Sequence, residues 1–325
     1  MMVLAVVGVS IGAEPVPFEA VWRVIAGRIG LGPDSATLLE QQIVWELRLP
    51  RVLLGLLVGS GLAIAGTVIQ AIVRNPLGDP YLVGIVPGAT LGALIVIVGG
   101  AGVASHLPLS LAAFVGGMLA FVITFLLSRQ GGQWPATRLV LSGVAIGYLF
   151  TSGTYFLQVM ASPSQVQRVL FWTLGSVAGA HWEDVLLPGL TIVAIAAWLL
   201  TQGEKLNALS LGTEVAGTLG VDVGRLQFLL MAAVALVTGT LVAVAGGVGF
   251  VGLVIPHLAR LLVGAENSRV LITGSLLGAG FLVLVDIFAR TAIRGAELPL
   301  GVFTAAIGGP FLIWLLNAHG RKAGR

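Results

Sequence analysis

The sequence contains no cysteine and few charged residues, and both shortages restrict what the chain can be. Without cysteine there are no disulfides, no thiolate metal sites and no cysteine nucleophile. Charged residues make up 10% of the 325 residues, hydrophobic residues make up 57%, and the mean hydropathy is +1.02. Too few polar side chains exist to cover the surface of a water-soluble globule. The composition therefore predicts an integral membrane protein.

The chain also lacks the residue groupings that bind metals, nucleotides or nucleic acids. Its four histidines are scattered without metal-ligand spacing. It carries no Gly-x4-Gly-Lys-Ser/Thr sequence, so it does not bind ATP through that motif. The formal charge of +3 and the pI near 9.8 fit basic loops that face anionic lipid. We therefore predict no cofactor, no metal site and no nucleic-acid partner.

Long apolar runs are abundant. A helix needs roughly 20 apolar residues to cross the hydrocarbon core of a membrane. Runs of about this length, some shorter, occur at 50–72, 80–100, 109–128, 136–160, 184–203, 227–246, 250–264, 270–290 and 300–318. The apolar start of the chain, 1–12, is interpreted as a first membrane helix that lacks some N-terminal residues. Together they predict an all-α polytopic membrane protein of about ten transmembrane helices, in a single transmembrane domain spanning 1–325.

Two polar stretches interrupt the apolar runs. Residues 15–46 mix charged and apolar positions at helical spacing, which predicts an amphipathic helix at the membrane surface. Residues 203–226 form the longest polar connector and predict one or two short helices broken at Gly212 and Gly220. Most loop arginines and lysines face the cytoplasm if this connector is cytoplasmic, as the positive-inside bias prefers. Residues 15–46 then lie on the periplasmic side.

Forty-six glycines recur at spacings typical of helix packing in membranes. Examples are Gly55-x3-Gly59 and Gly84-x3-Gly88-x3-Gly92. Small residues at such positions let helix backbones approach closely. The pattern predicts tight helix contacts at most of these glycines and helix breaks at a few.

Three segments, in this order and spacing, resemble a known family. The first is Leu-Arg-Leu-Pro-Arg at 47–51, followed by Arg-Asn-Pro-Leu-Gly-Asp-Pro at 74–80. The second is Gly-Phe-Val-Gly-Leu-Val-Ile-Pro-His-Leu-Ala-Arg at 249–260. The third is Glu-Leu-Pro-Leu-Gly at 297–301, leading to Gly-Gly-Pro-Phe at 308–311. Together they resemble the FecCD family of permeases, which includes bacterial importers of vitamin B12, haem and ferric siderophores.

The resemblance implies the fold of a type II ABC importer permease in the bacterial inner (cytoplasmic) membrane. It also implies a homodimer of this permease, two cytoplasmic ATP-binding subunits and a periplasmic or lipoprotein substrate-binding protein. The implied function is ATP-driven import of a ferric siderophore, haem or cobalamin by alternating access. Because ATP hydrolysis is then expected on the partner ATPase, the chain itself would be a non-catalytic permease subunit.

The resemblance further implies roles for single residues near the ends of the spans. Arg48, Arg51 and Arg290 match arginines that dock the binding protein, and a guanidinium fork suits bidentate contact with carboxylates. The alternative for Arg48 and Arg51 is that they anchor the helix to lipid phosphates. Asn75 and Leu77 match the cytoplasmic gate of the translocation path.

The remaining implied roles lie on the fifth span and the polar connector. The gate is completed by small residues of the fifth span, Ser142 and Gly143. The ATPase coupling segment matches Leu211, Gly212, Thr213, Glu214, Ala216, Gly220 and Val221. A merely solvated loop is the alternative for this connector.

Asp286 and Arg290 stand four residues apart, so a local ion pair on one helix face is expected. A carboxylate inside a membrane can instead belong to an ion-coupled secondary transporter, which is the alternative function. An intramembrane enzyme is disfavoured because the sequence has no His-Glu-x-x-His motif, no carboxylate dyad and no Ser/His constellation.

Overall fold

The structure is a computed structural model that describes residues 1–12, 15–31, 36–99, 107–293 and 296–323. Within these ranges the chain is helical, and its β pairing is limited to two isolated bridges, Gln130 with Gln133 and Ile293 with Ala296. The prediction of an all-α protein is confirmed.

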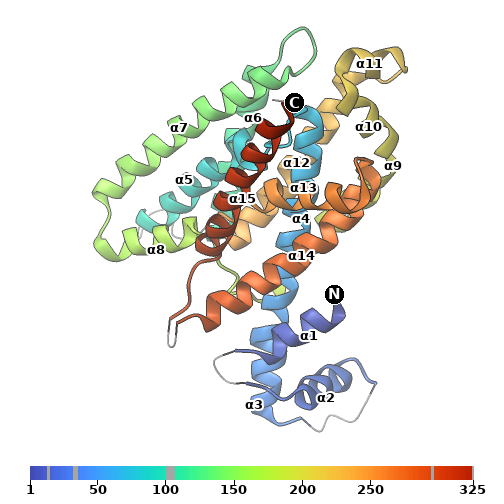
Figure 1. The fold of residues 1–325 in the computed structure, drawn as a ribbon. Coiled ribbons are helices and arrows are strands. Elements are labelled where there is room, and N and C mark those ends of the chain that lie inside the picture. Colours follow the sequence, from blue (N-terminus) through green and yellow to red (C-terminus); the bar gives the residue numbers. More distant parts are fainter. Residues whose placement is uncertain (13–14, 32–35, 100–106, 294–295, 324–325) are drawn as a thin grey trace.

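The helices follow one another along the chain (Figure 1). They are α1 (Met2–Ser10), α2 (Phe18–Arg28), α3 (Leu38–Gln41), the π-helical η1 (Gln42–Arg48), α4 (Leu49–Val73), the 3-10 turn η2 (Pro80–Val83), α5 (Ile85–Val98), α6 (Leu109–Ser128), α7 (Ala136–Met160), α8 (Pro163–Thr173), α9 (Trp182–Thr201), α10 (Gly203–Leu211), α11 (Thr213–Thr218), α12 (Val223–Ala245), α13 (Val251–Val263), α14 (Asn267–Thr291) and α15 (Leu300–Ala323).

The helix count agrees with about ten membrane helices. In the described part of the chain, six helical segments are long and apolar enough to cross a membrane. Three shorter apolar helices, α5, α13 and the first part of α15, bring the number to nine, and the apolar α1 is the tenth.

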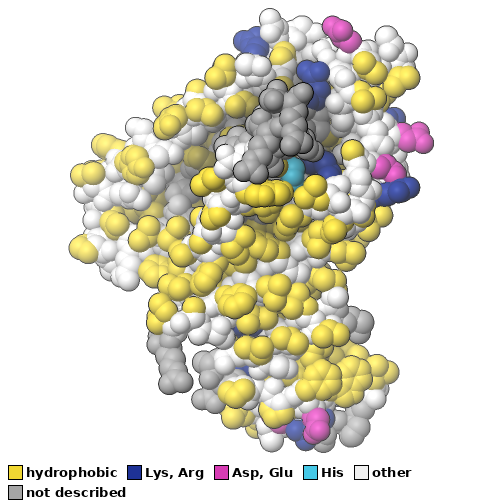
Figure 2. Space-filling model, viewed as in Figure 1, with side chains coloured by type: hydrophobic (Ala, Val, Ile, Leu, Met, Phe, Trp, Pro, Cys, Tyr) yellow, Lys and Arg dark blue, Asp and Glu magenta, His cyan; other side chains and the backbone are white. Residues whose placement is uncertain are grey.

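The molecule has two distinct ends (Figure 1). We call the end that carries α2 and α3 the α2 end, and the end that carries α10 and α11 the α11 end. Charged side chains on the face shown in Figure 2 gather toward these two ends, and hydrophobic side chains cover much of the surface between them. This distribution is that of a protein whose middle lies in lipid.

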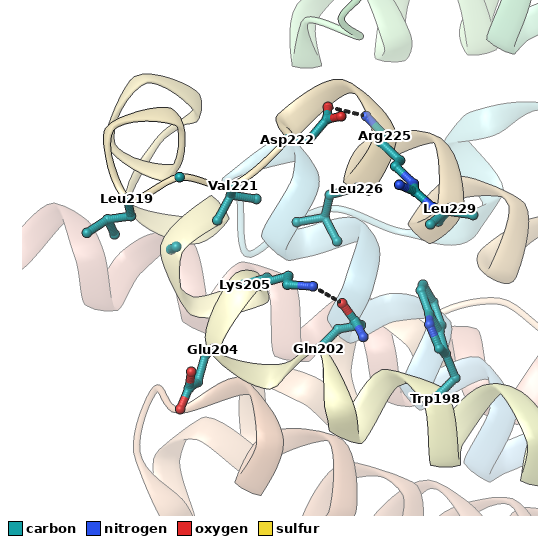
Figure 3. Close-up of a pocket in the computed structure, with 12 residues that line it drawn as sticks. Trp198, Gln202, Glu204, Lys205, Leu219, Val221, Asp222, Arg225, Leu226 and Leu229 are labelled. Atoms are coloured by element: carbon teal, nitrogen blue, oxygen red, sulfur yellow. Dashed lines mark hydrogen bonds between the residues drawn. The ribbon is translucent and has the colours of Figure 1, made fainter.

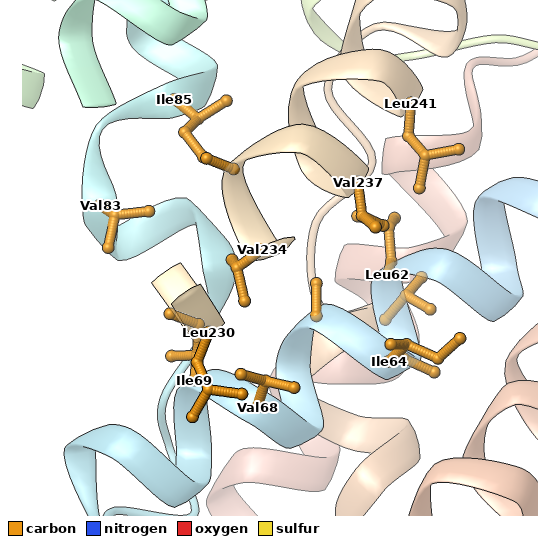
Figure 4. Packing of buried hydrophobic residues seen from close by; sticks show 14 of the residues in the cluster. Leu62, Ile64, Val68, Ile69, Val83, Ile85, Leu230, Val234, Val237 and Leu241 are labelled. Atoms are coloured by element: carbon orange, nitrogen blue, oxygen red, sulfur yellow. The ribbon is translucent and has the colours of Figure 1, made fainter. Parts of the chain in front are cut away.

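The core is built around α4 and α12. In their most apolar 18-residue windows, 78% of the residues of the α4 segment and 72% of those of α12 are buried, against 17% for α9. Leu62 and Val68 of α4 lie beside Val234 and Val237 of α12 in Figure 4. Most of the surface of these two central helices is therefore covered by protein, whereas α9 presents apolar side chains to the lipid.

Several of the spaced glycines allow helices to touch, as predicted. A Cβ at Gly59 of α4 would overlap the carbonyl oxygen of Gly278 in α14. A Cβ at Gly88 of α5 would overlap the carbonyl oxygen of Gly116 in α6. Backbone contact of this kind maximises dispersion attraction where no hydrophobic effect drives helices together.

The predicted span at 80–100 begins differently from the expectation. Asp79 accepts a hydrogen bond from the backbone N–H of Tyr81 at 2.8 Å, which starts the short η2 turn. Gly84 then adopts a left-handed conformation with φ 81°, and the α-helix begins only at Ile85. This reversal needs glycine, because a Cβ disfavours positive φ.

Two other helical regions correct the sequence analysis. Helix α8 was not predicted, although Ser162 and Gln165 form a capping box that begins it. Residues 15–46 are not one amphipathic helix: α2 is separate, and a second helix begins at the Thr37 capping box and continues into α4 as one segment, Leu38–Val73.

Candidate functional site

Three arginines meet at the α2 end. Arg48 lies at the end of η1, Arg51 in the first turn of α4, and Arg290 in the last turn of α14. All three line one cavity of about 510 Å³, and each is only 9% exposed. The structure therefore brings together the three arginines that the sequence analysis singled out for binding-protein docking.

Asp286 is the carboxylate that holds this cluster together. Its Oδ1 accepts hydrogen bonds from Nε and Nη2 of Arg51 at 3.0 and 2.9 Å. The predicted pair with Arg290 is present at 3.6 Å, yet the closer partner is Arg51, 235 positions earlier in the chain. The local pairing rule missed Arg51 because only the packing of α14 on α4 brings the two helices together.

The other two arginines use backbone acceptors of α1. Nη1 of Arg48 donates to the carbonyl oxygens of Val9 and Ser10 at 2.9 and 3.0 Å. Nη2 of Arg290 donates to the carbonyl oxygen of Gly8 at 2.5 Å. Both guanidiniums thus satisfy carbonyls at the end of α1, where a positive charge also complements the helix dipole.

Glu297 is a functional candidate that sequence reasoning missed. Its Oε1 accepts a hydrogen bond from Nη1 of Arg51 at 2.9 Å, and its side chain is 48% exposed. The described residues of the cluster therefore hold three arginines against two carboxylates, an excess of one positive charge. A partly buried cation in excess favours the approach of a further carboxylate.

The polar connector at the α11 end folds as two short helices, as predicted. Gly212 has φ 137° and separates α10 from α11, and Gly220 has φ 80° just after α11 ends. Leu211 and Leu219 are 71% and 65% exposed, whereas Ala216 is fully buried against the bundle. One side of the connector is anchored, and the other presents apolar side chains outward.

The other predicted coupling residues surround these positions. Thr213 and Glu214 begin α11, and Glu214 is exposed. Val221 is half-buried and lines a groove of about 700 Å³ between the connector and the start of α12 (Figure 3). Lys205 crosses the α10 side of this groove and donates to Oε1 of Gln202 at 3.0 Å.

The predicted gate residues lie around the connector between α4 and α5. Oδ1 of Asn75 accepts a hydrogen bond from the backbone N–H of Leu77 at 2.9 Å, which makes a tight turn after α4. Gly143 of α7 packs on the same connector, since a Cβ there would overlap the carbonyl oxygen of Leu82. Ser142 precedes it and is half-buried.

A polar anchor that sequence reasoning did not find ties this connector to α13. The buried amide of Gln70 donates to the carbonyl oxygens of Gly78, Gly252 and Leu253, each at 3.2 Å. Nη1 of Arg260 donates to Oε1 of the same amide. A lone glutamine in a long apolar run was the available signal, because a buried amide must find partners.

Asp79 is a second buried carboxylate, and it stands in the connector outside α4 and α5. It is 8% exposed and forms no ion pair within the described ranges. Burial raises the pKa of Asp79 to about 6, although the hydrogen bond from the Tyr81 N–H works against this rise. The pKa of this carboxyl therefore lies above that of an exposed aspartate.

Comparison with solved structures identifies the class of protein. The structure of a metal-chelate type ABC transporter in an inward-facing conformation superimposes with a TM-score of 0.81 and 32% identity, covering 98% of this chain and 97% of that one. PsaBC from Streptococcus pneumoniae, at TM-score 0.57 and 18% identity, shares the fold over 90% of this chain. The chain is a membrane permease subunit of an ABC importer, as predicted.

The family follows from the sequence as a whole. The model of the FecCD transport family matches residues 1–318, and the chain belongs to that family. It is 39% identical over 293 residues to the vitamin B12 import system permease BtuC of Vibrio cholerae, covering 90% of this chain and 88% of that protein. It is 38% identical over 309 residues to the cobalamin import system permease BtuC of Halobacterium salinarum, covering 93% and 79%.

These relationships confirm the predicted family, and with it a location in the bacterial inner membrane. They agree with a transport protein. The carboxylate that the ion-coupled alternative would need, Asp286, is engaged by two arginines.

Proposed function

We propose that the protein is the permease of an ATP-driven importer of a corrinoid, with cobalamin as the first candidate substrate. The sequence alone left a ferric siderophore, haem, cobalamin and a metal oxyanion open as substrates. Two relatives are named for vitamin B12 or cobalamin, and a similar structure is named for a metal chelate, which supports the corrinoid. The observation that carries the importer mechanism is the arginine cavity, with its one positive charge in excess.

In this proposal the α2 end faces the periplasm and receives the substrate-binding protein. A carboxylate of the binding protein enters the cavity and contacts Arg48, Arg51 and Arg290. Because Glu297 is half exposed, the incoming carboxylate replaces its contact with Arg51 at little desolvation cost. Asp286 stays in place and keeps the guanidiniums oriented.

The α11 end faces the cytoplasm and receives the ATPase. Residues 203–226 are the coupling segment, with Leu211, Val215 and Leu219 as the exposed apolar contacts and Ala216 as the anchor. Two copies of the permease work with two ATP-binding subunits, and closure of the ATPase dimer moves the connected helices as rigid bodies. Asn75, Leu77, Ser142 and Gly143 then form the cytoplasmic gate of an alternating-access path.

The first experiment measures ATP hydrolysis by the permease co-purified with its ATPase in lipid nanodiscs. A binding protein loaded in turn with cobalamin, haem or a ferric siderophore is added. Stimulation above the unloaded protein by cobalamin alone is expected. Stimulation by another chelate would replace the substrate, and uptake that follows an imposed ion gradient without any ATPase would overturn the importer proposal.

The docking site is tested by charge reversal. Arg48→Glu is expected to weaken binding-protein affinity by about tenfold or more, because a charge-assisted contact is replaced by repulsion. Arg168→Glu is the matched control, since Arg168 is exposed on α8 and does not line the cavity. Restored affinity with a binding protein that carries the opposite charge reversal would separate docking from misfolding, and equal affinity of both variants would contradict the docking role.

A further inference from the structure

A second groove lies at the α11 end and shares Asp222 and Arg225 with the groove in Figure 3. It has a volume of about 470 Å³ and opens between the end of α6, the turn that leads to α7, and the start of α12. Arg129 from the end of α6 and Arg225 from the first turn of α12 both line it. Its lining takes Asp222, Gly224 and Arg225 from the end of the coupling segment, but it includes none of the predicted gate residues and none of the coupling residues from Leu211 to Val221.

The wall of this groove is aromatic and rigid. The rings of Phe125 and Trp134 stack with centroids 4.3 Å apart at 15°, and Nε1 of Trp134 donates to the carbonyl oxygen of Phe125 at 3.0 Å. Phe228 of α12 lies 5.7 Å from Phe125. The guanidinium carbon of Arg129 stands 5.7 Å from the centre of a Trp134 ring, so this arginine is held beside the wall.

The charges at the groove favour an anion. Arg129 and Arg225 are exposed, and neither forms an ion pair with a carboxylate of the described residues. Asp222, the carboxylate that lines the groove, accepts the backbone N–H of Arg225 at 3.0 Å and caps α12. Two cations therefore face one carboxylate that is already hydrogen-bonded.

The neighbouring groove in Figure 3 provides an internal comparison. Two basic residues, Lys205 and Arg225, and two acidic residues, Glu204 and Asp222, line this groove. The formal charge of its lining is therefore zero. Lys205 is also bound to a glutamine. The net positive charge of the groove at Arg129 attracts an anion, whereas the neutral groove of Figure 3 does not.

The groove at Arg129 continues into the surface that faces lipid. Leu126 and Phe228 at its edge are 64% and 49% exposed, and Leu119 and Val122, further along α6, are 53% and 44% exposed. Only 28% of the most apolar window of α6 is buried. A phosphate beside two guanidiniums and an apolar chain along α6 match this combination, because basic pockets at membrane boundaries bind anionic headgroups.

We propose that this groove binds an anionic phospholipid of the leaflet at the α11 end. The phosphate lies between Arg129 and Arg225, and an acyl chain lies along α6 beside Phe228. The leaflet is the cytoplasmic one under the orientation given above, but the site itself does not depend on the transported substrate. A bound lipid would fill the gap between α6 and α12 and brace the start of α12, where the connector ends.

The test uses the purified full-length permease after removal of lipid in a neutral detergent, with bound lipid counted by native mass spectrometry. Phosphatidylglycerol is expected to bind at least about tenfold more tightly than phosphatidylcholine, since two basic residues attract a headgroup with a net negative charge. The R129Q/R225Q double variant is expected to lose this preference. Arg129→Lys in the wild-type background keeps the charge and is expected to retain most of it.

The matched control is the R138Q/R168Q double variant, which removes the same charge from exposed arginines that do not line the groove. It should keep the preference for phosphatidylglycerol. Equal binding by both double variants would overturn the proposal. Inorganic phosphate that competes at similar concentration would show an anion site that does not need lipid, and loss of bound phosphatidylglycerol when the ATPase is added would show a subunit contact; each result also overturns it.

Discussion

The arginines at the two ends of the molecule differ in burial and in their contacts. At the α2 end, three arginines are nearly buried and are held by Asp286, Glu297 and the carbonyls of α1. At the α11 end, Arg129 and Arg225 are exposed and form no ion pair among the described residues, and the leucines of the connector point outward. The arginines at the first end are held by contacts within the chain, whereas the arginines and leucines at the second end are exposed.

The two buried carboxylates, Asp286 and Asp79, also differ in their contacts. Asp286 accepts hydrogen bonds from Arg51 and lies 3.6 Å from Arg290. Asp79 accepts one backbone N–H and has no cation beside it in the described ranges. Removing a paired carboxylate strands its partners, whereas neutralising a solitary one removes a desolvation cost. The same kind of substitution should therefore have opposite signs at the two ends.

The largest effect is expected from Asp286→Ala. It removes the buried carboxylate that Arg51 and Arg290 share, which should lower the free energy of unfolding by about 3 kcal/mol or more. Thermal unfolding in detergent micelles measures the loss. Glu266→Ala is the control, since it breaks an exposed pair with Arg269 that contributes less than about 1 kcal/mol. Similar losses in both variants would remove the distinction between a buried and an exposed pair.

Asp79→Asn should act in the opposite direction. The folded pKa of Asp79 is raised to about 6, so the folded state holds a proton that the unfolded chain releases near pH 4. Its contribution to stability therefore falls as pH rises from about 4 to 6. Asparagine keeps the acceptor for the Tyr81 N–H and does not titrate.

The expected gain for Asp79→Asn is about 3 kcal/mol above pH 6 and close to zero below pH 4. Unfolding midpoints recorded across this pH range for the wild type and the variant measure it. A variant that is less stable than the wild type at pH 7 would mean that the carboxylate has a cationic partner.

A smaller effect is expected at the break in the connector. Gly212 has φ 137°, a conformation that a Cβ strains, so Gly212→Ala should cost about 1 to 2 kcal/mol and weaken ATPase association. Gly217→Ala is the matched control, because Gly217 lies inside α11 with nothing within 4 Å of an added Cβ. Alanine there should be neutral or slightly stabilising. Equal behaviour of the two variants would show that the break is not needed.

The smallest effect on stability is expected from Leu219→Ser. This leucine is 65% exposed, so the free energy of unfolding should change by no more than about 0.5 kcal/mol. Co-purification of the ATPase should nevertheless fall. Leu31→Ser, at a leucine that is 74% exposed at the α2 end, should leave co-purification unchanged. If both variants lose the ATPase, general loss of exposed apolar surface is responsible.

Much of the fold could be predicted because lipid imposes simple rules. A spanning helix must be long and apolar, so the runs at 109–128 and 136–160 gave α6 and α7 with the observed bounds. The breaks at Gly212 and Gly220 could be predicted for a similar reason, since glycine is the residue that tolerates their φ values. Helix α8 was missed because its residues are too polar for a span, and the capping box was its main signal.

The site was harder to predict than the spans. Arg48, Arg51 and Arg290 were found through family resemblance, and hydropathy gave no reason to group residues 242 positions apart. The residues that these side chains contact were harder still to predict. Glu297, a partner of Arg51, appeared only as part of a sequence motif, and the contact between Gln70 and Arg260 was not predicted. Their contacts depend on helix packing, which brings together residues from distant parts of the chain.

The sequence by itself determined that the chain lies in a membrane, where its helices are, which family it belongs to and where its two polar regions lie. Composition and local pattern suffice for this, because they decide whether a segment enters lipid. Only the tertiary structure decided which charges meet. Asp286 stands four residues from Arg290, yet the packing of α4 against α14 gives its closest contact to Arg51. In a low-dielectric interior, the distance and orientation of two charged groups decide which of them pair. Both are set by how the helices pack.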